Sequence, residues 1–227
     1  MHSAENILIV APHADDEILG CGGIISRYKT EGNNVFVAIM TNASIGAPKL
    51  FSKDVIENVR KEALAAHNFL NVNQTFFYEF PAPDLMNHPS FEISIELDKL
   101  IRHLKISILF IPHRGDMHKD HAIIYYSSLV AARPINDCPI RSIYAYETLS
   151  ETEWASPFAD ESFMPNVFID ISNDLTHKLK AMQYFESQLK DPPHPRSLKT
   201  IEALATFRGA TIGVKYAEAF MLIRIVK

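Results

Sequence analysis

The stretch NILIVAPHADDE, residues 6–17, decides the fold. Its first half is a continuous apolar run, which is typical of a strand buried on both faces of a parallel sheet. Its second half is polar and acidic, which suits the start of a helix, where backbone N–H groups are free. A buried strand that passes through a short turn into a helix begins a βαβ unit. We therefore predict a helix over 17–31 that ends at Gly32 and Asn33.

The same alternation of short apolar runs and segments of helical period continues along the chain. The sequence predicts further strands over 35–40, 75–80, 106–111, 141–146, 167–171 and 219–226. It predicts further helices over 54–70, 91–104, 120–132 and 176–189. We expect an α/β fold, a Rossmann-like three-layer sandwich with a mostly parallel sheet, formed by a single domain over 1–227.

Two segments lack a regular pattern. Residues 147–165 are polar and contain proline, and we interpret them as a rim or lid. The segment KDPPHPR, residues 190–196, is interpreted as a rigid, non-helical connector. Gly20, Gly22 and Gly23 lie inside the first helix rather than in the turn before it, so they do not fit a dinucleotide-binding fingerprint. We expect them to allow close packing of this helix on the sheet.

Composition restricts the class of function. The 227 residues include 22 basic and 27 acidic side chains, and this balance gives no field that attracts nucleic acid or a membrane surface. The apolar runs are much shorter than the roughly 20 residues of a membrane-spanning helix, and the first residues do not resemble a signal peptide. The two cysteines, Cys21 and Cys138, are too few for a disulfide framework. We expect a reducing, cytoplasmic setting.

Metal-ligating side chains follow two of the predicted strands. His13, Asp15 and Asp16 come after the strand at 6–11, and the loop PHRGDMHKDH, residues 112–121, comes after the strand at 106–111. The carboxyl ends of parallel strands share one edge of a sheet, where α/β folds bind ligands. If these strands are neighbours, an imidazole of the second loop joins His13 and Asp16. Two nitrogens and one carboxylate form a catalytic zinc set with an open position.

Each cluster, taken alone, also fits a simpler role. Asp15 and Asp16 could merely cap a helix, and the second cluster could be a solvated loop. The same ligand set also occurs in non-haem iron oxygenases, and a non-catalytic metal-binding protein is a third alternative. Both clusters lie at the carboxyl ends of buried strands, which favours a metal site. The additional carboxylate of Asp15 beside the metal ligands favours a hydrolase.

These motifs resemble those of the LmbE-like or PIG-L family of zinc-dependent N-acetylglucosaminyl deacetylases. The family's paired signatures correspond to His13-Ala14-Asp15-Asp16-Glu17 and to His118-Lys119-Asp120-His121. The resemblance extends to Arg60-Lys61-Glu62 and to Tyr216-Ala217-Glu218-Ala219-Phe220. Ala14 and Lys119 stand where the family commonly has proline, and neither position supplies a side chain to the chemistry.

The resemblance implies a role for each motif residue. The ligands of Zn2+ would be His13, Asp16 and His121, and Asp15 would be the general base. His118 would stabilise the oxyanion, and Asp120 would hold His118 charged and oriented. The implied substrate is a small molecule, an acetamido sugar of the GlcNAc type or its conjugate. Many members form homo-oligomers, and this sequence leaves that state open.

Four side chains are expected to contact the substrate, namely Arg60, His113, Arg114 and Asp116. Alternatively, Arg60 pairs with Glu62 on an exposed helix face, and Asp116 stabilises the turn after Gly115.

Three further residues have no assigned part in the chemistry. Trp154 lies in the expected rim, where it either stacks on a sugar or packs under the loop or at a subunit interface. Arg208 and Glu218 are expected to support the fold or the floor of the pocket.

Overall fold

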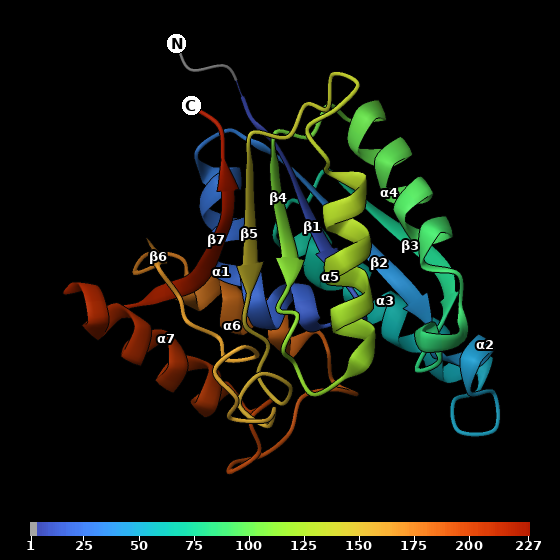
Figure 1. The fold of residues 1–227 in the computed structure, drawn as a ribbon. Coiled ribbons are helices and arrows are strands. Elements are labelled where there is room, and N and C mark those ends of the chain that lie inside the picture. Colours follow the sequence, from blue (N-terminus) through green and yellow to red (C-terminus); the bar gives the residue numbers. More distant parts are fainter. Residues whose placement is uncertain (1–3) are drawn as a thin grey trace.

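The computed structural model describes residues 4–227, which form one seven-stranded sheet in the order β3-β2-β1-β4-β5-β7-β6 (Figure 1). The strands are β1 (Asn6–Ala11), β2 (Asn34–Asn42), β3 (Gln74–Pro81), β4 (Ile108–Pro112), β5 (Ser142–Tyr146), β6 (Val167–Asp170) and β7 (Ala217–Ile225). Strands β1 to β5 pair in parallel, whereas β7 runs antiparallel to both β5 and β6. The predicted α/β class and mostly parallel sheet are confirmed.

Helices cover both faces of the sheet and make it the middle of three layers (Figure 1). One face is covered by α1 (Asp16–Thr30), α3 (Lys53–Phe69), α6 (Leu175–Gln183) and α7 (Leu198–Ile212). The other face is covered by α4 (Ser90–His103) and α5 (Lys119–Ala131). The short helices α2 (Ala43–Gly46) and η1 (Leu85–Asn87) lie in connections. No helix within residues 4–227 is both long and apolar enough to cross a membrane.

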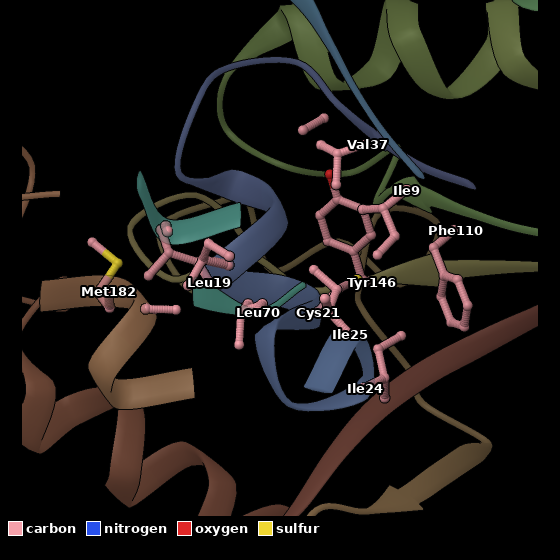
Figure 2. Close-up of a cluster of buried hydrophobic side chains, with 14 of the residues drawn as sticks. Ile9, Leu19, Cys21, Ile24, Ile25, Val37, Leu70, Phe110, Tyr146 and Met182 are labelled. Carbon is pink, nitrogen blue, oxygen red and sulfur yellow. The ribbon is translucent and has the colours of Figure 1, made fainter. Parts of the chain in front are cut away.

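The apolar run of β1 serves both faces. Ile7 and Ile9 belong to the buried cluster under α1, and Leu8 and Val10 belong to the cluster under α4 and α5. Successive side chains of a strand point to opposite faces, so a strand covered on both sides needs an uninterrupted apolar sequence. Figure 2 shows the first cluster, where Ile9 lies beside the ring of Tyr146.

The glycines of α1 mark close approaches, as expected. A Cβ atom on Gly20 would lie 2.3 Å from the ring of Tyr146 on β5, and one on Gly23 would lie 2.7 Å from Ile171. A Cβ atom on Gly22 would meet the side chain of Lys178 at 2.9 Å. The close packing therefore extends from the sheet to α6.

The elements differ most from the sequence predictions beyond residue 134. There, helix α7 was not predicted and the helix predicted over 176–189 ends at Gln183; before residue 134, only the short α2 and η1 were not predicted. Only Ile201, Ala205 and Gly209 of α7 are buried, whereas Phe207 is 64% exposed, so the apolar pattern of α7 does not mark one face. The remaining strands and helices begin and end within two residues of the predictions.

The two loops that carry the predicted metal ligands begin side by side. Strands β1 and β4 are hydrogen-bonded neighbours, with Ile7 opposite Ile108 and Ile9 opposite Phe110. Their carboxyl ends therefore lie at the same edge of the sheet (Figure 1). This adjacency was the condition that the sequence-based metal site required.

Candidate active site

Three side chains at this edge could hold a metal ion. His13 follows β1, Asp16 opens α1 and His121 lies in the first turn of α5, and their ligand atoms lie within 4.8 Å of one another. Oδ2 of Asp16 is 3.3 Å from Nδ1 of His13 and 3.3 Å from Nε2 of His121. These are the three residues predicted as ligands, so the structure brings the whole predicted set together.

The environment of His121 fits a metal ligand. Its Nδ1 lies 2.8 Å from Oδ2 of Asp116, which makes Nδ1 the donor and leaves a lone pair on Nε2. Within the described residues, the buried Nε2 has no hydrogen-bond partner. A lone pair that faces a second carboxylate in a buried site is the arrangement that a divalent cation satisfies.

Without a cation, protons take its place. Burial opposes the charge on Asp16, but His121 and His13 outweigh it and hold the pKa of Asp16 well below its usual range. Burial likewise lowers the pKa of His13, but hydrogen bonds to Asp120 and Asp16 raise it to about 9. The imidazole that binds a metal must be neutral, so metal binding displaces protons from this group.

The carboxylate of Asp120 lies closer to His13 than to His118. Its Oδ2 is 3.3 Å from Nε2 of His13 and 3.9 Å from Nδ1 of His118. The backbone N–H of Asp120 donates to Nδ1 of His118 at 3.2 Å. Burial and the charge of His13 lower the pKa of His118 to about 4. This differs from the expectation that Asp120 holds His118 charged, because the carboxylate turns toward the other imidazole.

Asp15 has an unusual backbone conformation, with φ of 113° directly before α1. A non-glycine residue in this region costs roughly 1–3 kcal/mol, so its surroundings must hold it there. The N–H of Asp15 donates to Oε2 of Glu17 at 3.1 Å, and Oε1 of Glu17 lies 3.0 Å from Nε2 of His67. His67 in turn lies 2.8 Å from the hydroxyl of Thr75. This buried chain of hydrogen bonds links the turn to α3 and β3. The sequence did not identify His67, because a single histidine on a helix does not indicate a functional role.

The carboxylate of Asp15 is buried beside an arginine. Its Oδ2 lies 3.1 Å from Nη1 of Arg196, and Nη2 of the same arginine lies 3.8 Å from Oε1 of Glu151. Burial raises the pKa of Asp15 to about 7, although the charge of Arg196 lowers it. A carboxyl group with a pKa near neutrality suits general-base chemistry. The sequence did not identify Arg196 or Glu151 as site residues, because Arg196 lies in the predicted connector and Glu151 in the predicted rim. The one signal for Arg196 was the presence of an arginine in a rigid, proline-rich segment.

A cavity of about 500 Å³ opens beside these groups. His13, Asp15 and His118 form its metal end, and Glu151, Arg196 and Arg60 add charged side chains. Its lining also includes apolar side chains from α3 and the segment before α3. A concave site with a few convergent polar groups is the usual form of a small-molecule site.

Of the four expected substrate contacts, only Arg60 lines this cavity. Its guanidinium donates to Oε1 of Glu79 at 2.6 Å rather than pairing with Glu62. His113 is buried with Nε2 2.7 Å from the carbonyl oxygen of Glu161.

The other two expected contacts also point elsewhere. Arg114 bonds to the hydroxyl of Tyr126 and the carbonyl oxygen of Asp160. Asp116 is buried against His121. In the loop after β4, Asp116 therefore contacts the predicted metal ligand His121, whereas His113 and Arg114 anchor the rim.

The rim, residues 147–165, contacts the site from one side. Thr152 donates through its hydroxyl to Oδ1 of Asp116 at 2.6 Å. Trp154 is 52% exposed and lies edge-on to the ring of His194, outside the cavity lining. Arg208 pairs with Glu147 and Glu218 pairs with Lys178, each at 2.6 Å, in agreement with the supporting roles expected for them.

Comparison with known proteins shows which family this chain is similar to. Residues 8–132 match the family described as PIG-L: GlcNAc-PI de-N-acetylase. The chain is 30% identical over 190 residues to the uncharacterized deacetylase YaiS of Escherichia coli (strain K12), covering 81% of this chain and 91% of YaiS.

Two solved structures share the fold. The conserved protein TT1542 from Thermus thermophilus has a TM-score of 0.77 and 25% identity, with 97% of this chain and 96% of that chain covered. N,N'-diacetylchitobiose deacetylase from Pyrococcus horikoshii has a TM-score of 0.79 and 22% identity, with 97% and 84% covered. Since the family match spans more than half of the chain and YaiS is similar over most of it, this chain belongs to the PIG-L family of deacetylases.

Proposed function

We propose that this protein hydrolyses the N-acetyl group of an acetamido sugar of the GlcNAc type, free or in a conjugate, and that its metal ion is Zn2+. The products are acetate and the free amine. The observation that carries this proposal is the group of His13, Asp16 and His121 beside a cavity that His13 and Asp15 line. The family description supports the sugar, because it names an N-acetylglucosaminyl compound as substrate.

His13, Asp16 and His121 would hold the ion with two nitrogens and one carboxylate, which leaves a position for water. When bound, the ion supplies an activated water and polarises the acetamide carbonyl. Asp116 orients His121 through Nδ1 and so keeps Nε2 available for ligation.

Asp15 takes the proton of the attacking water. Its pKa of about 7 lets it accept a proton near neutrality and release it again in the same cycle. Arg196 favours the ionised form, because its guanidinium lies 3.1 Å from the carboxylate. The proton then passes to the leaving amine, which must be protonated before the C–N bond breaks.

His118 donates a hydrogen bond to the oxyanion as a neutral imidazole. Its Nδ1 accepts the backbone N–H of Asp120, so the ring hydrogen is on Nε2. The ring lines the cavity, and a lowered pKa keeps it uncharged near neutrality. A fixed donor that faces the developing charge is worth about 2.7–4 kcal/mol at comparable sites.

Arg60 is the remaining candidate for substrate contact. Its guanidinium lines the cavity, and bonds to Glu79 and to the carbonyl oxygen of Tyr78 hold it in place. A fixed arginine presents several N–H donors in one plane, which suits neighbouring hydroxyl groups of a sugar.

The test is acetate release from N-acetylglucosamine, its methyl glycoside and diacetylchitobiose by zinc-loaded, chelated and iron-loaded protein. We expect release that depends on zinc and is lost in Asp15→Asn. The matched control is Asp137→Asn, an exposed aspartate that also has a positive φ, of 56°. Release unaffected by chelation or by Asp15→Asn would contradict the mechanism. Oxygen consumption by the iron-loaded protein without acetate release would favour an oxygenase.

A further inference from the structure

The cavity beside the metal group is lined by both polar and apolar side chains. Five of its apolar lining residues come from the segment before α3 and from the first two turns of α3, namely Leu50, Phe51, Val55, Ile56 and Val59. We call these five residues the apolar wall. The cavity is continuous from His13 and Asp15 to this wall.

The apolar wall is exposed to water. Leu50 is 78% exposed, Val55 is 48% exposed and Phe51 is 39% exposed. A single exposed apolar residue is common, but these three belong to one concave surface. Their side chains gain free energy when an apolar group removes them from water.

The position of the wall on α3 explains why the fold does not cover it. The hydroxyl of Ser52 caps the helix by accepting the N–H of Val55. The buried residues of α3 begin only at Ala63, so the core holds the second half of the helix and its first turns extend over the cavity. The apolar residues of these first turns therefore do not serve core packing.

Arg60 is the charged lining residue that adjoins the apolar wall on α3. It is next to Val59 and one turn beyond Ile56 on α3, and it lines the same cavity. A sugar placed between the metal group and Arg60 leaves the volume along the wall for whatever the sugar carries. An unsubstituted acetamido sugar is mostly polar and gains little from such a surface.

We infer that the apolar wall binds an apolar substituent, alkyl or aryl, linked to the N-acetylated sugar. This inference rests on the proposed deacetylase function and specifies its substrate class. The wall is continuous with the metal end of the cavity, and this continuity favours a part of the substrate over a separate protein partner.

The test compares methyl and hexyl β-glycosides of N-acetylglucosamine, each below its micelle concentration. Each methylene removed from water contributes about fourfold to affinity, so partial burial of the hexyl chain gives at least about a tenfold higher kcat/KM. In Leu50→Ser and Val55→Ser this ratio should fall toward one. The matched control is Ile95→Ser, which changes an apolar residue that is 47% exposed on α4, on the other face of the sheet.

Each outcome bears on one proposal. If neither glycoside releases acetate, the deacetylase function itself fails. If both glycosides react with equal kcat/KM in the unchanged protein, only the apolar subsite is refuted. A second copy of the chain is the other possible occupant of the wall, and sedimentation velocity tests for it. A dimer that Leu50→Ser converts to monomers would assign the wall to that second copy and overturn the inference. Circular dichroism of each variant verifies folding.

Discussion

The carboxylate of Asp116 lies 2.8 Å from Nδ1 of His121, and both side chains are fully buried. The hydroxyl of Thr152 holds the other oxygen of Asp116 at 2.6 Å. Asp116 therefore fixes the tautomer and the ring orientation of a predicted metal ligand. The sequence placed Asp116 in the right loop but assigned it to the substrate, because spacing alone does not show which way a side chain points.

Asp116→Ala should weaken zinc binding about 10–100-fold, as expected when the carboxylate behind a ligating imidazole is lost. Thr152→Val should weaken it much less, because the contact of Asp116 with His121 remains. His121→Ala should lose stable zinc binding. Competition with a chromophoric chelator measures all three affinities. An Asp116→Ala protein with unchanged affinity would show that Asp116 does not orient the ligand.

Asp15→Asn should retain zinc but lose about 10²–10⁴-fold in kcat, the usual contribution of a general base. Asparagine preserves the size of the side chain and tolerates positive φ, so the turn before α1 should keep its shape. Zinc content by mass spectrometry, measured on the same sample as acetate release, separates the two effects. Turnover equal to that of the parent would exclude Asp15 as the base.

Most of the fold was predictable because its signals are local. The continuous apolar run of β1 predicted a strand covered on both faces, and β4 gave the same signal. Helix α7 lacked such a signal, because its few buried residues are mostly small and a large apolar residue, Phe207, lies on its exposed side. The antiparallel direction of β7 is set by its pairing with β5 and β6, which no local pattern encodes.

The residues of the candidate site likewise fall into those that the sequence could predict and those that it could not. His13, Asp16 and His121 were predictable because each belongs to a polar motif that follows a buried strand. Arg196 lies 181 positions after Asp15 in the chain, so only the tertiary structure could bring these two together. The orientations of His113 and Arg114 depend on the rim, whose conformation the sequence did not indicate.

Arg196→Gln should move the acidic limb of the kcat/KM profile to higher pH. The general base acts in its ionised form, so activity is lost as the pH falls through its pKa. The guanidinium lowers the pKa of Asp15, and its removal should raise that limb by about one unit. Arg102→Gln, at an exposed ion pair on α4, is the control and should leave the profile unchanged. A shift to lower pH would contradict this relationship.

Gly20→Ala should destabilise the fold by roughly 1–3 kcal/mol, the cost of an extra methyl group in a packed core. The new Cβ atom would lie 2.3 Å from Cδ2 of Tyr146, whose hydroxyl donates to the carbonyl oxygen of Val10 at 2.9 Å. The free energy of unfolding in urea measures the loss. A second substitution, Tyr146→Leu, should be less damaging in Gly20→Ala than in the parent. Equal damage in both backgrounds would show that the two positions do not clash.

Asp15→Asn should stabilise the metal-free protein at pH 8. Folding raises the pKa of Asp15 from 3.8 to about 7, so the buried charge opposes folding at every pH where the unfolded carboxyl is ionised. The destabilisation caused by this buried charge is complete above pH 7, decreases as the pH falls toward 4 and is absent below that. Three pKa units correspond to a gain of up to about 4 kcal/mol, which is an upper bound because Arg196 loses its partner.

Urea unfolding in the presence of a chelator at pH 8 and pH 5 measures this gain, with Asp137→Asn as the control that should show none. Saturating zinc should reduce the advantage, because a nearby cation stabilises the ionised carboxylate of the parent and not the amide of the variant. A gain that grows as the pH falls from 8 to 5 would have the wrong sign for a carboxyl group with a raised pKa. A loss of stability in Asp15→Asn at both pH values would instead show that Arg196 stabilises Asp15 in its charged form, and the acidic limb of the activity profile would then have to come from another group.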